Sequence, residues 1–290
     1  MSAERRAALS PRAPVSRRGR ESAVFRTGWA RTAPARALRE VVQVAGLAPL
    51  IRRELTLDVH GADELAELDG PALIVSNHAS HLDTAVLLTT LPAKRRRRTA
   101  VAAAADYFFD VWWRATGSSI AFNTFPIERR GGSLSATPGD LLADGWSLIV
   151  YPEGTRSVDG VMGRFRMGAA WLAVQHQVPV IPVGLRGTYA AMPRGRNWPV
   201  PGRPRVSVRY GAPIVPRPDE TPREMAPKIT RAVRALVAED QATWWQVQRH
   251  GDAVLEAAPG ARWARIWREA APPVKGGTPP RPRIWRQAQD

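Results

Sequence analysis

The feature that most constrains the fold is a regular alternation of short apolar runs with amphipathic stretches between residues 55 and 250. Runs typical of strands lie at residues 55–59, 72–76, 99–104, 147–151, 180–185 and 206–210. Helical spacing is found between them, at residues 82–91, 107–115, 134–144, 167–177 and 222–248. Because strands that alternate with helices are typical of parallel sheets, the sequence predicts a single α/β domain with a largely parallel central sheet flanked by helices.

The segments outside this pattern differ in composition. Residues 1–35 are rich in Arg, Ala, Ser and Pro and are expected to be disordered, and residues 251–290 form a basic tail rich in Trp and Pro. Residues 36–54 are expected to form an amphipathic helix, with Arg39 at the edge of its apolar face, that packs on the core or lies on a membrane. Residues 119–125 are expected to be extended, because Pro126 disfavours a helix just before it.

The net charge of +16 indicates a polyanionic partner, either nucleic acid or the anionic surface of a membrane. The excess lies mainly in residues 1–54, in residues 241–290 and in the basic run at residues 94–98. The chain has no cysteine, which excludes disulfides, thiolate metal sites and thiol catalysis. The most apolar early stretch, residues 41–51, is too short to cross a bilayer, so no transmembrane helix is expected.

A strand-like run leads directly into a candidate acid–base pair. His78 follows residues 72–76, and Asp83 stands five positions later, early in the next predicted helix. A strand–loop–helix turn can fold that carboxylate back onto one imidazole nitrogen, leaving the other nitrogen as a general base. Such a pair also arises by chance, and the spacing with His81 matches no zinc pattern, so no metal site is expected.

Three further segments combine strand-like runs with polar or proline residues. Residues 151–157 contain Glu153, Gly154 and Arg156, whose guanidinium can bind a phosphate, although a surface turn with a local ion pair is an equally good interpretation. Residues 125–132 carry two arginines before a glycine pair, which is typical of an anion site or of a charged turn. Residues 178–184 are apolar, and the proline within them favours a strand end or an edge.

Taken together and in this order, the four segments resemble the 1-acylglycerol-3-phosphate O-acyltransferase family, also called lysophosphatidic acid acyltransferases. The family pattern has Asn-His-x4-Asp, Gly-x-x-Phe-Ile-x-Arg, Glu-Gly-Thr-Arg-Ser and a Val-Pro-x-Ile-Pro-like block, and the first and third match fully here. The second departs from it, since Asn123 stands where the family has Gly and Pro126 where it has an apolar residue. The resemblance covers about residues 55–215 and implies a fold similar to glycerol-3-phosphate acyltransferases.

The resemblance implies a direct acyl transfer. His78 would deprotonate the free hydroxyl of a lysophospholipid, Asp83 would orient His78, and the hydroxyl would attack the thioester of acyl-CoA or of an acyl carrier protein. No cofactor beyond that acyl thioester is implied. The residues assigned to the acceptor are Asn77, Arg129, Glu153, Gly154, Thr155 and Arg156, and those assigned to the acyl chain are Val180, Ile181 and Pro182. Lysophosphatidate is the acceptor that the family implies first, and other lysolipids or glycolipids remain alternatives.

The family is membrane-associated, which favours a lipid partner for the basic regions. The residues expected to contact an anionic membrane are Lys94, Arg95, Arg96, Arg97, Arg98, Trp263 and Trp267. The expected location is therefore peripheral, on the cytoplasmic side of the cell membrane, and a solvated turn is the alternative for the basic run.

Functions of other classes explain fewer of these features. A nucleic-acid-binding protein would explain the arginines, but the sequence has no zinc-finger, basic-zipper or RNA-binding signature, so no specific nucleic acid is expected. A serine hydrolase would need a Gly-x-Ser-x-Gly elbow, which is absent. A non-catalytic membrane-binding module would not need His78 and Asp83.

Overall fold

The computed structural model describes residues 27–104, 112–127 and 137–239, and within these ranges seven strands form one sheet. The strands are β1 (Thr56–His60), β2 (Leu73–Ser76), β3 (Thr99–Ala104), β4 (Thr124–Ile127), β5 (Ser147–Val150), β6 (Val180–Arg186) and β7 (Arg205–Tyr210). Their spatial order is β1-β7-β6-β2-β5-β3-β4. All neighbouring pairs are parallel except β6 and β7, so β1 and β7 run against the other five strands. The predicted α/β fold with a largely parallel sheet is confirmed.

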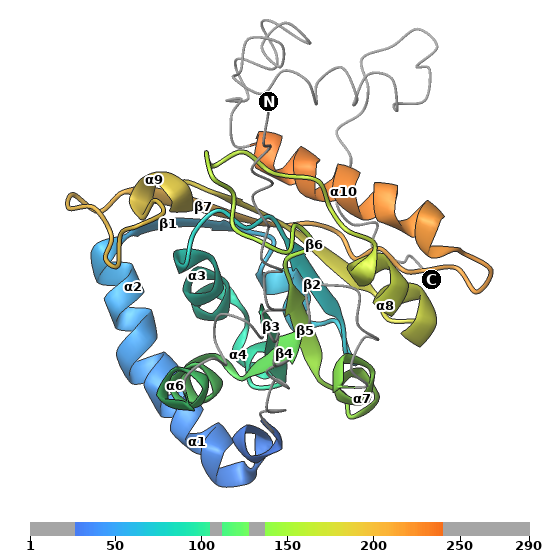
Figure 1. Cartoon of the computed structure of the whole chain (residues 1–290), viewed down its shortest axis with the longest axis horizontal. Helices are drawn as coiled ribbons and strands as arrows, with labels where there is room; N and C mark the ends of the chain where they lie inside the picture. The colour runs from blue at the N-terminus through green and yellow to red at the C-terminus, as the bar shows by residue number, and fades with distance from the viewer. Residues whose placement is uncertain (1–26, 105–111, 128–136, 240–290) are drawn as a thin grey trace, which may run out of the picture.

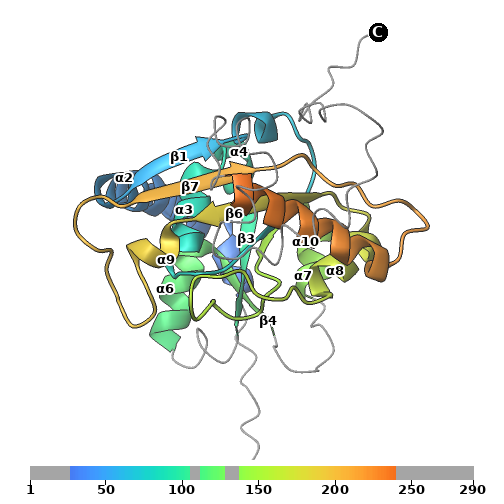
Figure 2. The same cartoon turned by 90° about the horizontal axis from the view of Figure 1, so that it is seen from above.

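Helices cover both faces of the sheet. The α-helices are α1 (Ala33–Val41), α2 (Ala48–Glu54), α3 (Leu82–Thr90), α4 (Ala93–Arg96), α6 (Trp112–Phe122), α7 (Thr137–Ala143), α8 (Gly168–His176), α9 (Thr188–Ala191) and α10 (Pro222–Glu239). Two 3₁₀-helices, η1 (Gly28–Arg31) and η3 (Asp63–Ala66), and a π-helical stretch, η2 (Val42–Leu47), complete the described elements. Figures 1 and 2 show α3, α6 and α9 on one side of the sheet and α7, α8 and α10 on the other.

The core lies in two layers because side chains alternate along each strand. In β2, Leu73 and Val75 pack with α8 and α10, whereas Ile74 points to the opposite layer with α3. All four β2 residues are buried, and so are all four of β5, as expected for central strands covered on both faces. Because β2, β3, β4, β5 and β6 run parallel to one another, their carboxyl ends meet at one edge of the sheet. This edge is where open α/β sheets bind ligands.

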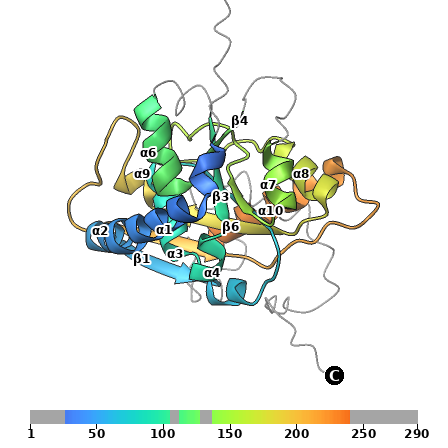
Figure 3. The same ribbon diagram turned by 90° about the horizontal axis from the view of Figure 1, so that it is seen from below.

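The N-terminal helices begin earlier than predicted. Of residues 1–35, which were expected to be disordered, residues 28–31 form η1, and α1 begins at Ala33 with Pro34 in its first turn, a position that proline favours. From there the helical segment continues through η2 into α2, which ends at Glu54. Figure 3 shows α1 and α2 following one another along one side of the molecule. No helix in the described ranges has both the length and the apolarity needed to cross a membrane.

The helix pair packs on the core with polar residues rather than with the apolar face alone. Arg39 was expected at the edge of that face but is buried, and it donates to the main-chain carbonyls of Ser119 and Ile120 at the end of α6. Gln43 is also buried and donates to the carbonyl of Ala121. Burial lowers the pKa of Arg39 to about 10, with a further contribution from neighbouring arginines, so it remains charged at pH 7. A cation at a helix C-terminus is stabilising, which explains why Arg39 is buried at the end of α6.

The prediction of an extended segment at residues 119–125 is wrong for its first half. The helix α6 continues to Phe122 and ends at Asn123, whose φ of 54° is left-handed. The Asn123 side-chain amide donates to the carbonyl of Thr99, which joins this turn to β3. Pro126 restricts only Phe125, which already lies in the edge strand β4.

Candidate active site

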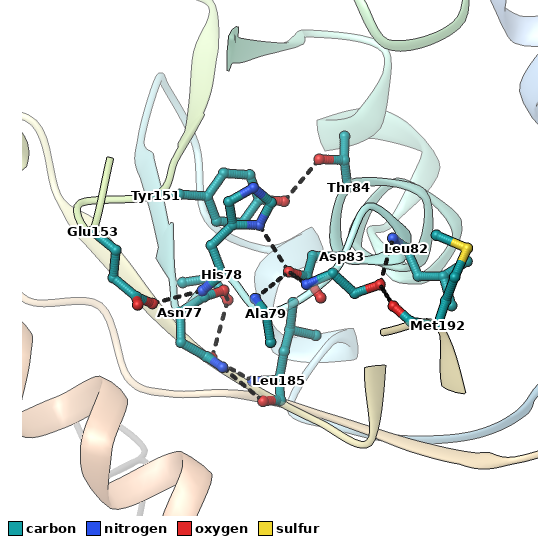
Figure 4. A network of polar contacts seen from close by, with 12 residues as sticks. Asn77, His78, Ala79, Leu82, Asp83, Thr84, Tyr151, Glu153, Leu185 and Met192 are labelled. Carbon is teal, nitrogen blue, oxygen red and sulfur yellow. Dashed lines mark hydrogen bonds and ion pairs between the residues drawn. The ribbon is translucent and has the colours of Figure 1, made fainter. Parts of the chain in front are cut away.

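The polar turn after β2 folds around one buried carboxylate. His78 Nδ1 lies 2.8 Å from Asp83 Oδ2, and the same oxygen accepts from the main-chain N–H groups of Ala79 at 2.7 Å and Ser80 at 2.8 Å (Figure 4). Asp83 stands in the first turn of α3 and its side chain has no solvent exposure. Since a carboxylate only accepts, Nδ1 carries the proton, and Nε2 presents its lone pair for proton transfer.

The imidazole of His78 is also held through its flat face. The ring of Tyr151 stacks on it, with 4.1 Å between centroids and 17° between planes, and the Tyr151 hydroxyl lies 3.0 Å from Thr84 Oγ1 on α3 (Figure 4). Burial raises the pKa of the Tyr151 hydroxyl well above its usual value, so the ring stays neutral. The sequence motifs did not select Tyr151 as a site residue, although its place directly after β5 puts it at the same sheet edge as His78.

The main chain of His78 is fixed by the loop that follows β5. Glu153 Oε1 accepts from the His78 N–H at 2.7 Å, and the Ser157 N–H donates to the His78 carbonyl at 2.8 Å. The second Glu153 oxygen accepts from the Gly163 N–H at 2.8 Å. Burial raises the pKa of Glu153, while these two N–H groups act in the opposite direction. Glu153 is thus a positioning residue, since each of its oxygens accepts a main-chain N–H, and its binding of the acceptor remains a prediction.

Asn77 has a similar positioning role. Its side-chain amide donates to the Leu185 carbonyl at 2.8 Å and accepts from the Leu185 N–H at 2.9 Å, which ties the turn after β2 to β6 (Figure 4). Only 4% of Asn77 is exposed, and its expected contact with the acceptor remains a prediction. The sequence motif identified these residues but not the partners of their hydrogen bonds.

Three residues of the β5 loop lie nearer to the surface. Gly154 has a φ of +71°, which strains any residue with a side chain, so this position favours glycine. Thr155 is exposed and Arg156 is partly exposed. Among the predicted acceptor residues that the structure describes, Thr155 and Arg156 are therefore the accessible side chains. Arg129 lies outside the described residues.

His81 is a second histidine beside the pair. Its pKa is lowered to about 4, first by burial and then by electrostatic interactions with Arg156, His78 and Arg194, against an opposing contribution from Asp83. At neutral pH its imidazole is uncharged. The motif contains this residue without giving it a role. Within the described ranges, His, Asp and Glu side chains form no group of three that could hold a metal ion.

The residues predicted to border the acyl chain belong to the core. Val180 and Ile181 have no solvent exposure, and Pro182 is buried as well. Val180 packs in the layer of α8 and α10, and Ile181 packs in the layer of α3. The prediction is therefore wrong for this structure, because these side chains fill the interior on both faces of a central strand.

The basic run after α3 contributes more to the fold than predicted. Arg95 is 6% exposed and cannot contact a membrane. Its guanidinium donates to the carbonyls of Leu65, Leu68 and Gly70 and to Ser147 Oγ. Arg95 therefore holds the segment between η3 and β2 against the start of β5.

The neighbours of Arg95 have partners at the surface. Arg96 lies 2.7 Å from Glu40 on α1 with 12% of its side chain exposed, and Arg97 lies 3.2 Å from the same carboxylate. Lys94 Nζ lies 2.8 Å from Asp69 Oδ1, and the Arg98 guanidinium lies over the Trp146 ring. Lys94 and Arg97 keep most of their side chains in solvent, so an anionic contact remains a prediction for them. Trp263 and Trp267 lie outside the described residues.

Comparisons with known proteins give one consistent result. Residues 56–186 match the family described as acyltransferases. The chain is 31% identical to the chloroplastic 1-acyl-sn-glycerol-3-phosphate acyltransferase BAT2 of Brassica napus over 142 residues, which cover 48% of this chain and 39% of that protein. It is 31% identical to the alpha form of 1-acyl-sn-glycerol-3-phosphate acyltransferase from Mus musculus over 162 residues, covering 53% of this chain and 54% of that one. The matches thus span about two fifths to one half of these relatives.

A solved structure extends the similarity to the fold. The 1-acyl-sn-glycerophosphate acyltransferase PlsC from Thermotoga maritima superposes with a TM-score of 0.57 and 25% sequence identity. The match covers 71% of this chain and 82% of that one. The matched family segment contains β1 to β6 and every residue of the His78 turn and the β5 loop described above.

Proposed function

We propose that the chain, whose residues 56–186 match the acyltransferase family, moves a fatty acyl group from acyl-CoA or an acyl carrier protein to the free hydroxyl of a lysophospholipid. The acceptor proposed is 1-acylglycerol-3-phosphate, which gives phosphatidic acid. The observation that carries the proposal is the buried Asp83 carboxylate on His78 Nδ1, which leaves Nε2 as a base at the ligand-binding edge of the sheet. Another lysolipid or a glycolipid is the alternative acceptor.

The proposed reaction needs one base and no covalent enzyme intermediate. His78 Nε2 takes the proton of the acceptor hydroxyl while the oxygen attacks the thioester carbonyl carbon. The tetrahedral intermediate then expels the thiolate, the C–S bond breaks, and the imidazolium returns the proton to sulfur. Asp83 keeps the ring oriented and stabilises the imidazolium, and the stacked Tyr151 ring prevents it from turning away. The acyl thioester is the only co-substrate in this scheme.

Mixing the protein with acyl-CoA and lysophosphatidate is expected to release one CoA thiol for each phosphatidic acid formed. The measurement combines a thiol reagent with mass analysis of the lipid product over a panel of lysophospholipids and glycolipids. Thiol release without any acylated lipid would indicate a thioesterase and would contradict the proposal. Faster acylation of an acceptor without a phosphomonoester would favour the alternative acceptor.

We also propose that the chain binds the cytoplasmic membrane surface peripherally through α1, η2 and α2. The packing of these helices supports this, because the polar residues Arg39 and Gln43 occupy part of the buried face, beside the apolar residues Ala48 and Ile51. The apolar residues that remain exposed on them are Leu38, Val41, Val44 and Leu50. An apolar stripe on a surface helix is typical of a helix that lies in the membrane interface.

Replacing both Val41 and Val44 with aspartate is expected to weaken binding to phosphatidylglycerol-containing vesicles by at least about tenfold, since a buried valine contributes about 1.5 kcal/mol. The measurement is sedimentation with vesicles at low and high salt. Val215→Asp is the matched control, because Val215 is 68% exposed and lies outside these helices, before α10. Equal binding of the double variant and the wild-type protein would overturn the proposal.

A further inference from the structure

The loop between α9 and β7, residues 192–204, is attached to the turn that holds the His78–Asp83 pair. Ser80 Oγ donates to the main-chain carbonyl of Met192 at 2.8 Å, and Ser80 itself is buried. The loop closes on itself where the Val200 N–H donates to the Ala191 carbonyl at 2.8 Å. Figure 4 shows Met192 beside Leu82 at the start of α3. The bond from Ser80 therefore ties the start of this loop to the turn that carries His81, the residue that follows Ser80.

Two arginines from different loops act on His81. Arg156 comes from the loop after β5, and Arg194 stands two residues after Met192 and is exposed. The positive charges of both arginines help to lower the pKa of His81 to about 4, after burial. The segment 187–204 contains no acidic residue. His81 is thus an uncharged imidazole in the turn of the candidate base. The two arginines come from loops that are each hydrogen-bonded to this turn, one through Ser157 and the other through Met192.

We propose that Arg194 binds the phosphate of the acceptor together with Arg156, near the turn that carries His81. A phosphomonoester carries nearly two negative charges at neutral pH, and forked guanidinium donors match its oxygens. The uncharged His81 can add one N–H donor without carrying a charge. This inference rests on the proposed function, and it assigns acceptor specificity to a loop outside the four sequence motifs.

Arg194→Ala is expected to raise the KM for lysophosphatidate about 10- to 100-fold, as for loss of a hydrogen bond to a charged group, and to leave kcat and the KM for acyl-CoA unchanged. Arg194→Lys should recover part of the loss. Arg196→Ala is the matched control, because Arg196 is exposed on the same loop and its Nε donates to the carbonyl of Trp198, two residues away. A rise in the KM for acyl-CoA would assign Arg194 to the donor phosphates and would overturn the inference, and so would equal effects of the two alanine variants.

A binding measurement separates this inference from the proposed reaction. The His81 ring signals in an NMR titration with sn-glycerol 3-phosphate are expected to shift in the wild-type protein and in Arg196→Ala, and to shift much less in Arg194→Ala. This result holds even in a protein that does not turn over lysophosphatidate. Unchanged titration of Arg194→Ala would contradict the inference, whereas absence of acyl transfer with normal phosphate binding would contradict only the proposed function.

Discussion

Replacing His78 with alanine is expected to lower the rate of acyl transfer by about 10²- to 10⁴-fold while the chain stays folded, because a positioned general base contributes that much to a reaction. The ring makes one side-chain hydrogen bond, to Asp83, and stacks on Tyr151, while the contacts with Glu153 and Ser157 use only the main chain of residue 78. The frame of the turn therefore survives the substitution. The measurement is kcat for thiol release, together with circular dichroism to test the fold.

The structure offers a matched control for this experiment. His60 also forms a hydrogen bond with a carboxylate, at 2.9 Å from Asp58, but this pair stands on the edge strand β1 and half of the His60 side chain is exposed. His60→Ala is expected to keep full activity. Near-normal turnover in His78→Ala would remove His78 from the mechanism, and a similar loss in both variants would indicate that histidine substitutions damage the fold.

Replacing Arg95 with methionine is expected to lower the free energy of unfolding by about 3 kcal/mol. Methionine fills similar space but donates no hydrogen bond, so the carbonyls of Leu65, Leu68 and Gly70 lose a charged donor in a buried place. The loss is partly offset because the guanidinium is no longer buried, a state that already lowers the pKa of Arg95. The measurement is urea unfolding at pH 7 by circular dichroism.

The neighbouring Arg97 serves as the control for Arg95. Arg97 keeps 63% of its side chain exposed and its contact with Glu40 is a surface ion pair, so Arg97→Met is expected to change the free energy of unfolding by less than about 1 kcal/mol. If both variants unfold at the same urea concentration, Arg95 does not hold the segment before β2. Such a result would indicate that Arg95 contributes no more to stability than the exposed residues of the basic run.

The parts of the fold that could be predicted from the sequence depend on local patterns. The central strands β2 and β5 are short apolar runs, and the hydrogen bond between His78 and Asp83 joins residues five apart within one turn. Periodicity and short spacings carry that information directly. The parallel sheet followed from the alternation of such runs with helices.

The parts that could not be predicted depend on which distant residues meet. Arg95 and Arg97 are the same type of residue in one basic run, so the sequence does not distinguish them. Arg95 is the buried one because it donates to carbonyls near η3, about 25 to 30 positions away, whereas Arg97 stays exposed. Arg39 is buried because it donates to two carbonyls at the end of α6, which lies about 80 residues later in the chain. Glu153 and Asn77 stand in the motifs, yet the motifs do not show that their side chains form hydrogen bonds with distant main-chain groups.

The hydrogen bonds that hold His78 and its neighbour Asn77 in place also determine at which stage of folding this site can form. The partners in these bonds are 75 residues apart for Glu153 and His78, and 108 residues apart for Asn77 and Leu185. Contacts between distant positions require large loops to close and therefore form slowly. The His78–Asp83 bond can form within the first third of the chain, but its placement waits for β5 and β6 to join the sheet. A chain interrupted before β6 would contain both residues of the pair and still lack the frame that aims them.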